Sequence, residues 1–150
     1  MKRNSLVIVV IVAVALCVAV PVVFESIAAS TQTKTVTNAG KIKTIGVGIY
    51  SDQACLNAIA SIDWGTISPG SNVNKTVYIR NEGNSAATLT LAVSNWNPSN
   101  SPTYMTLRWD YAGQSVSKGQ VIQVKFTLGV SSSISGITSF GFDMTITASG

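Results

Sequence analysis

Residues 41–150 alternate between apolar and polar or small side chains in segment after segment. Successive side chains of a β-strand point to opposite faces, so this period of two predicts strands with one buried face. Seven such segments are present, at residues 45–49, 62–64, 73–79, 89–93, 105–111, 122–130 and 140–146. Turn-forming clusters separate them. The pattern predicts an all-β fold, an antiparallel β-sandwich of jelly-roll or immunoglobulin-like type with about seven strands.

The N-terminus has the architecture of an export signal. A short basic stretch precedes an apolar run over residues 6–24, in which only Pro21 is neither aliphatic, aromatic, Ala nor Cys. We predict a helical signal peptide over residues 1–28, cleaved between Ala28 and Ala29, where the small residues fit a signal-peptidase site. A run of this length can also span a bilayer, so an uncleaved anchor is the alternative. In both cases the remaining chain is exported, and with cleavage it contacts the membrane only during export.

The composition excludes most enzyme classes. The chain has no histidine, which excludes a Ser-His-Asp triad, a His-ligated zinc site and a Cys-His nucleophile pair within it. The acidic residues after the signal segment are far apart in sequence: Asp52, Asp63, Glu82, Asp110 and Asp143. We therefore assign no catalytic, cofactor-binding or metal-binding residue, and we expect no small-molecule substrate. Calcium held between copies needs no linear motif and is left open.

Removal of residues 1–28 leaves eight Lys and Arg against five Asp and Glu, a net charge of +3. The basic residues are scattered along the chain without a basic stripe, so we expect no nucleic-acid partner. Cys55 is the only cysteine after position 28, which leaves no intrachain disulfide, and we expect a buried thiol. The sequence Asn74-Lys75-Thr76 is an N-glycosylation sequon, and its alternative interpretation is three ordinary strand residues.

Residues 29–40 form a segment of their own, between the signal and the sandwich at 41–150. Threonines alternate with other residues in it, as in an extended strand, but neither side is apolar. One interpretation is a flexible spacer. The other is a strand donated to the sheet of a neighbouring copy, where backbone hydrogen bonds supply the affinity. The candidate donor residues are Thr31, Thr33, Thr35, Val36 and Thr37.

Three stretches carry a resemblance to a known family: 61–70 (Ser-Ile-Asp-Trp-Gly-Thr-Ile-Ser-Pro-Gly), 75–84 (Lys-Thr-Val-Tyr-Ile-Arg-Asn-Glu-Gly-Asn) and 94–98 (Ser-Asn-Trp-Asn-Pro). With them, residues 40–150 and the signal segment resemble the subunits of archaeal bundling pili, relatives of the TasA-type biofilm matrix fibre proteins. The resemblance implies a jelly-roll-like subunit polymerised by donor-strand complementation, with its N-terminal strand inserted into the next subunit. The donor would lie within residues 29–50, chiefly in their first half. The resemblance does not assign the acceptor groove residue by residue.

Two functions follow from these observations. The leading hypothesis is a structural subunit of a secreted cell-surface filament, a homopolymer that bundles laterally and serves cell-cell adhesion and biofilm formation. Its low charge and its many Thr, Ser and Asn residues suit lateral contacts between copies. The alternative is a membrane-anchored monomeric β-sandwich that binds glycans or a protein partner at the cell surface.

Overall fold

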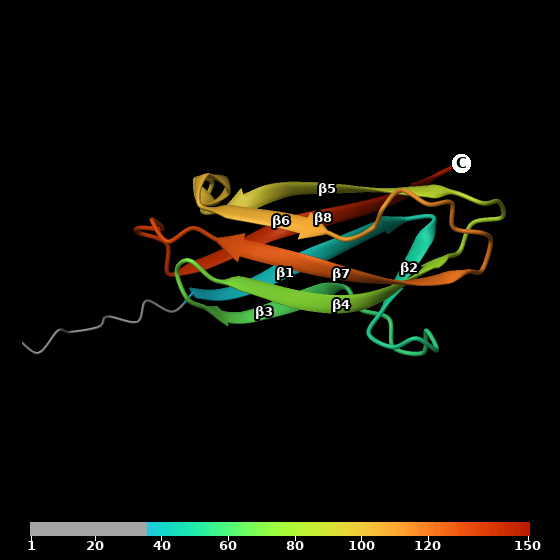
Figure 1. Cartoon of the computed structure of the whole chain (residues 1–150), viewed down its shortest axis with the longest axis horizontal. Helices are drawn as coiled ribbons and strands as arrows, with labels where there is room; N and C mark the ends of the chain where they lie inside the picture. The colour runs from blue at the N-terminus through green and yellow to red at the C-terminus, as the bar shows by residue number, and fades with distance from the viewer. Residues whose placement is uncertain (1–35) are drawn as a thin grey trace, which may run out of the picture. The chain divides into compact units, whose positions relative to one another are not determined.

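The computed structural model describes residues 36–150, which form two four-stranded sheets (Figure 1). The predicted signal peptide, its cleavage site at Ala28 and Ala29, and the candidate donor residues Thr31, Thr33 and Thr35 lie outside the described residues. The strands are β1 (Val36–Ile45), β2 (Val47–Tyr50), β3 (Ser61–Ile67), β4 (Asn72–Asn81), β5 (Thr88–Asn97), β6 (Met105–Trp109), β7 (Val121–Val130) and β8 (Ser139–Ser149). A single 3₁₀ turn, η1 (Ser101–Thr103), joins β5 to β6.

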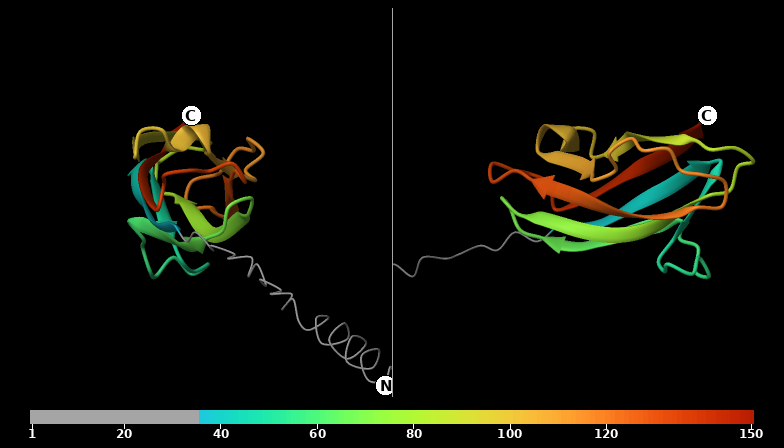
Figure 2. Two further views of the ribbon diagram at one scale, coloured as in Figure 1. Left: turned by 90° about the vertical axis from the view of Figure 1, so that its left-hand side faces the viewer. Right: turned by 45° about the vertical axis from the view of Figure 1, so that its right-hand side comes forward.

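One sheet has the strand order β3-β1-β8-β5 and the other has the order β2-β4-β7-β6. We call them sheet A and sheet B. All strand pairs in them are antiparallel except β1 and β8, which run parallel. The two sheets face each other across the core (Figure 2). The expectation of an all-β, sandwich-like architecture with mainly antiparallel sheets is thus confirmed for the described residues.

The core lies between the sheets and is built by period-two alternation. In β7 and β8 nearly every second side chain is buried, among them Phe126, Leu128, Phe142, Met144 and Ile146. Side chains of β3 and β4 complete it, and Trp64 is its largest fully buried residue. Burial of this apolar surface is the main stabilising contribution, since the described residues contain no disulfide.

The seven alternating segments correspond to β2 through β8, and β1 is an eighth strand that the pattern did not count. The first segment, 45–49, is not continuous, because Ile45 ends β1 in sheet A and Val47 begins β2 in sheet B. Gly46 between them has φ +74°, a conformation that glycine adopts without a steric penalty. The chain therefore changes sheets at this residue.

The loops gather at the two ends of the sandwich. The connections over residues 51–60, 82–87 and 110–120 lie at one end, and β1 begins at the other, together with η1 and residues 131–138 (Figures 1 and 2). Residues 52–60, expected to be helical or irregular, form an irregular loop. Within residues 36–150, no helix is long and apolar enough to cross a membrane.

Candidate assembly site

Strand β1 occupies an interior position of sheet A, with a partner on each side. Residues 36–41 pair with β3, and residues 37–45 pair with β8. Val36 and Thr37, the two candidate donor residues that the structure describes, are the first residues of β1 and lie opposite Ile67 and Thr66 of β3. The strand continues to Ile45, so it overlaps the predicted donor segment 29–40 only at residues 36–40 and extends five residues beyond it.

The described side chains of β1 contribute little to the core. Gly40 is buried and has no side chain, and Ile42 is only partly buried. Ala39, Lys41 and Thr44 are exposed. Among the β1 residues whose side chains are described, only Ile42 packs partly against the core, and the backbone of β1 is paired to β3 and β8 on its two sides. Such pairing is the bonding by which a strand can be added to a sheet.

Gly40 faces the floor of the site. A Cβ atom at this position would lie 3.2 Å from Nε1 of Trp64, 3.2 Å from Cε of Met144 and 3.3 Å from Cε2 of Phe142. These distances are tighter than ordinary van der Waals contact, so the backbone of β1 approaches the aromatic core as closely as glycine permits. The indole of Trp64 is 1% exposed, and its Nε1 finds no hydrogen-bond acceptor among the described residues.

A bulge in β3 directs Trp64 toward this floor. Asn38 and Ala39 of β1 lie opposite Gly65 and Asp63, which leaves Trp64 as the extra residue. Gly65 has φ +67°, and its N–H donates to Oδ1 of Asp63 at 2.8 Å. The bulge resets the alternation, so that Trp64 and Ile67, three positions apart, are both buried.

Without β1, the sheet would be divided. Strands β3 and β8 would face each other across about 10 Å, twice the usual spacing between strands, with unpaired N–H and C=O groups on both sides. We call this position the acceptor slot. Its walls are the facing edges of β3 and β8, and its floor is formed by Trp64, Phe142 and Met144. Only a strand can satisfy both edges at once.

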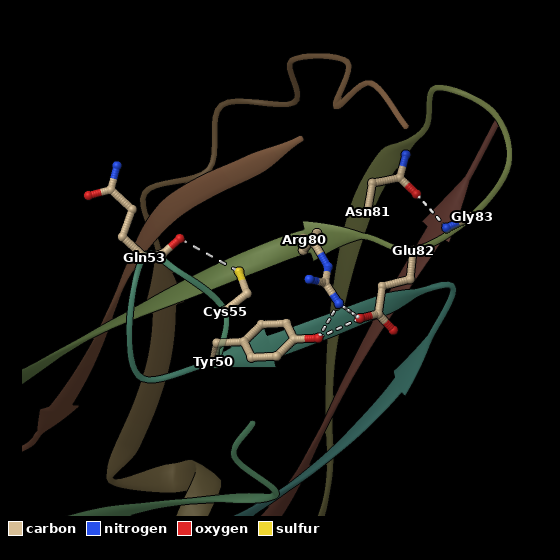
Figure 3. Close-up of polar contacts among 7 residues, drawn as sticks. All are labelled: Tyr50, Gln53, Cys55, Arg80, Asn81, Glu82 and Gly83. Carbon is tan, nitrogen blue, oxygen red and sulfur yellow. Dashed lines mark hydrogen bonds and ion pairs between the residues drawn. The ribbon is translucent and has the colours of Figure 1, made fainter. Parts of the chain in front are cut away.

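A polar cluster of Tyr50, Arg80 and Glu82 holds the end of β2 in sheet B (Figure 3). The Tyr50 hydroxyl donates to Oε1 of Glu82 at 2.5 Å, and Arg80 donates from Nη2 to both Tyr50 and Glu82 at 2.7 Å. The backbone N–H of Glu82 donates to the carbonyl of Gly46 at 3.1 Å. The side chain of Tyr50 thus connects β2 to Arg80 of β4 and to Glu82, and the backbone of Glu82 connects to Gly46.

The charges of this cluster support one another. The hydrogen bond from Tyr50 and then the one from Arg80 lower the pKa of Glu82, and the Glu82 carboxylate raises the pKa of both Tyr50 and Arg80. The Arg80 guanidinium also lies 5.0 Å from the centre of the Tyr50 ring. The cluster therefore stabilises the end of β2 as a unit, and Gly46 connects this strand of sheet B to β1 of sheet A.

The loop after β2 is held by one carboxylate. Asp52 accepts hydrogen bonds from the backbone N–H groups of Leu56 and Asn57 and from the Asn57 side chain, at 3.1, 2.8 and 3.1 Å. The first of these bonds is the largest cause of the lowered pKa of Asp52. Cys55, in the same loop, has a buried thiol that contacts the carbonyl of Gln53 at 3.8 Å (Figure 3).

Asn74, the sequon residue, lies in β4 on the outward face of sheet B and is exposed. Its Oδ1 accepts a hydrogen bond from Oγ1 of Thr127 at 2.7 Å. The position is thus accessible on the surface, while glycosylation itself stays a prediction. Within the described residues, no three His, Cys, Asp or Glu side chains gather closely enough to hold a metal ion.

Comparison with known protein families found no family model that matches the chain, and comparison with curated proteins found no match.

Proposed function

We propose that this protein is the structural subunit of an extracellular filament, in which β1 of one copy fills the acceptor slot of the next. The observation that carries the proposal is that β1 occupies an interior position of sheet A, between β3 and the distant β8, and is paired through its backbone on both sides. Transfer of such a strand to a neighbour preserves its hydrogen bonds and links the copies. Head-to-tail linkage of this kind does not close on itself and produces a fibre.

The resemblance to archaeal bundling pilus subunits supports the same proposal. It implies a jelly-roll-like sandwich, export through a signal peptide, and a role in cell-cell adhesion and biofilm formation. The outward faces of the sheets suit lateral bundling, because they carry many Thr, Ser and Asn side chains and few charges. Many weak hydrogen bonds between filaments can form there without strong charge repulsion.

The alternative function is a monomeric surface domain held by an uncleaved N-terminal anchor. One observation favours it: β1 fills the slot of its own chain, so a single copy can already form complete sheets. The two functions differ in which copy supplies β1, and this difference can be measured directly.

Lys41 in β1 and Ser61 in β3 are exposed and directly opposite each other in the antiparallel register. Cα atoms of such pairs lie about 4.5–5.5 Å apart, within reach of a disulfide. In a C17S/C55S background, copies carrying only K41C are mixed during assembly with copies carrying only S61C, then sheared from the cell surface and oxidised. Strand donation is expected to give a disulfide-linked dimer of one copy of each kind on a denaturing gel.

The double variant K41C/S61C, with both cysteines in one chain, further distinguishes strand donation from a closed monomer, in which β1 fills the slot of its own chain. Strand donation predicts a ladder of disulfide-linked copies on the gel. A closed monomer predicts an internal disulfide and a single monomer band. The matched control is T76C/K125C, an exposed opposite pair of β4 and β7 in sheet B, which should form only the internal disulfide. Monomer bands from both double variants, with no mixed dimer from the single variants, would refute strand donation.

A further inference from the structure

The outward face of sheet B carries a groove that strand exchange does not use. The groove has a volume of about 410 Å³, within the range of about 300–1,000 Å³ typical of small-molecule sites. Its lining residues belong to the start of β4, to η1 and β6, and to the end of β7, and these segments lie at the end of the sandwich where β1 begins (Figure 1). Its lining is formed by Asn72, Thr103, Tyr104, Thr106, Arg108, Thr127, Gly129, Val130 and Ser131.

A glycine forms part of the floor. Thr106, Gly129 and Asn72 lie side by side across the three strands. A Cβ atom on Gly129 would lie 2.7 Å from Oδ1 of Asn72, so the amide of Asn72 occupies the space that a side chain would take. The polar side chain of Asn72 therefore lies along the floor of the groove.

Arg108 is the only charged residue of the lining, and no acidic residue accompanies it. It forms a row with Thr127 and Asn74 across the sheet. Its side chain makes no ion pair with any of the described residues; the ion pair found among them joins Arg80 and Glu82. A guanidinium offers a planar fork of donors that matches a carboxylate, and hydroxyl and amide groups beside it suit the hydroxyls of a sugar.

We propose that this groove binds an acidic carbohydrate, with Arg108 on a sugar carboxylate and with Thr106, Thr127 and Asn72 on sugar hydroxyls. The half-buried ring of Tyr104 supplies an apolar surface for the face of a sugar ring. A peptide fits less well, because Val130 is the only aliphatic side chain of the lining and the groove lies on the face of the sheet. The proposal is independent of strand donation, because the acceptor slot belongs to sheet A.

The test uses the full chain in a mild detergent, produced without N-glycosylation so that Asn74 carries no glycan. Tetragalacturonate is the acidic probe, and maltotetraose is the neutral one. Isothermal titration is expected to detect binding of tetragalacturonate only. R108Q is expected to lower the affinity for tetragalacturonate at least tenfold. K118Q removes a positive charge from the loop at the opposite end of the sandwich and should change this affinity by no more than twofold.

A second variant probes the groove without changing charge. G129A places a methyl group where the Asn72 amide lies and is expected to lower the affinity for tetragalacturonate. The circular dichroism spectrum should stay that of the wild type, which shows that the fold is unchanged. Acetate at equal carboxylate concentration should not compete. The proposal is overturned if maltotetraose binds equally well, if acetate competes, if R108Q and K118Q have equal effects, or if tetragalacturonate does not bind.

Discussion

Substitution of Gly40 by valine tests whether the backbone of β1 packs directly on the floor of the acceptor slot. The Cβ atom alone would lie 3.2–3.3 Å from Trp64, Met144 and Phe142, and the two methyl groups of valine extend farther into the same space. Trp64 and Met144 are at most 1% exposed, so neither side chain has free volume into which to move. Valine must therefore displace the β1 backbone or distort the floor of the acceptor slot.

Overpacking of this kind costs about 1–3 kcal/mol in a well-packed core. Each joint of the proposed filament contains one seated β1, so the whole penalty applies to each joint. At 1.4 kcal/mol for each factor of ten, the critical concentration for assembly from chains whose β1 is not yet in a slot should rise by a factor of about 5–150. A monomer whose β1 fills its own slot carries the same penalty, so for assembly from that monomer the penalty cancels and G40V should lower only the urea midpoint.

Sedimentation of purified material at a series of concentrations measures the critical concentration, and urea unfolding measures the stability. The matched control is G141A in β8, because a Cβ there would meet only the carbonyl of Ala39 at an ordinary 3.5 Å. G40A gives an intermediate case with a single added carbon. If G40V assembles and unfolds as the wild type does, Gly40 does not lie over Trp64 and the seating of β1 described above is wrong.

Four further predictions concern other parts of the molecule. The pKa of Asp52 is lowered in the folded state, so Asp52 stabilises the fold above its ordinary pKa of about 3.9. This contribution is lost as the pH falls through the folded-state pKa. D52N should therefore remove this acid dependence of the urea midpoint. Y50F removes the largest cause of the lowered pKa of Glu82, so that pKa should rise toward its ordinary value in a carbon-13 NMR titration of the carboxyl group. Mass spectrometry of the exported protein should detect a glycan on Asn74 that T76A abolishes and T76S retains. G46A places a side chain at φ +74°, at a cost of about 1–2 kcal/mol to the closed chain, and should raise the ratio of filament to monomer by a factor of about 5–30, as measured by sedimentation.

The period-two pattern was sufficient to predict β2 through β8, because each of these strands has one face against the core. In β8 the apolar set of Phe140, Phe142, Met144 and Ile146 is entirely buried, as strict alternation requires. The pattern did not predict the change of sheet at Gly46, because Ile45, Val47 and Ile49 alternate correctly across it. The glycine at position 46, between Ile45 and Val47, was the one indication of this change of sheet. It was not sufficient for a prediction, because glycines also occur within continuous strands.

The acceptor slot could not be predicted from the sequence. Its walls come from residues 61–67 and 139–147, which are separated by residues 68–138 and are joined within sheet A through β1. The break in alternation between Trp64 and Ile67, with Asp63 and Gly65 beside it, was the one local sign of the bulge that forms the floor. The residues of β1 gave no further indication, because they do not alternate regularly between apolar and polar side chains.

A closed chain and a donated strand contain the same pairs between β1, β3 and β8, so these pairs cannot decide between the two states. What differs is the connection at Gly46, where the closed chain must turn from sheet A into sheet B, and any new contact between copies. Within one chain, β1 is always close to its own slot, and this high effective concentration favours the closed state. Strand donation therefore has to be driven by relief of the turn at Gly46, by contacts along the filament, or by a high local concentration of exported copies. The exchange has a barrier, because departure of β1 leaves the edges of β3 and β8 unpaired and uncovers the floor formed by Trp64, Phe142 and Met144.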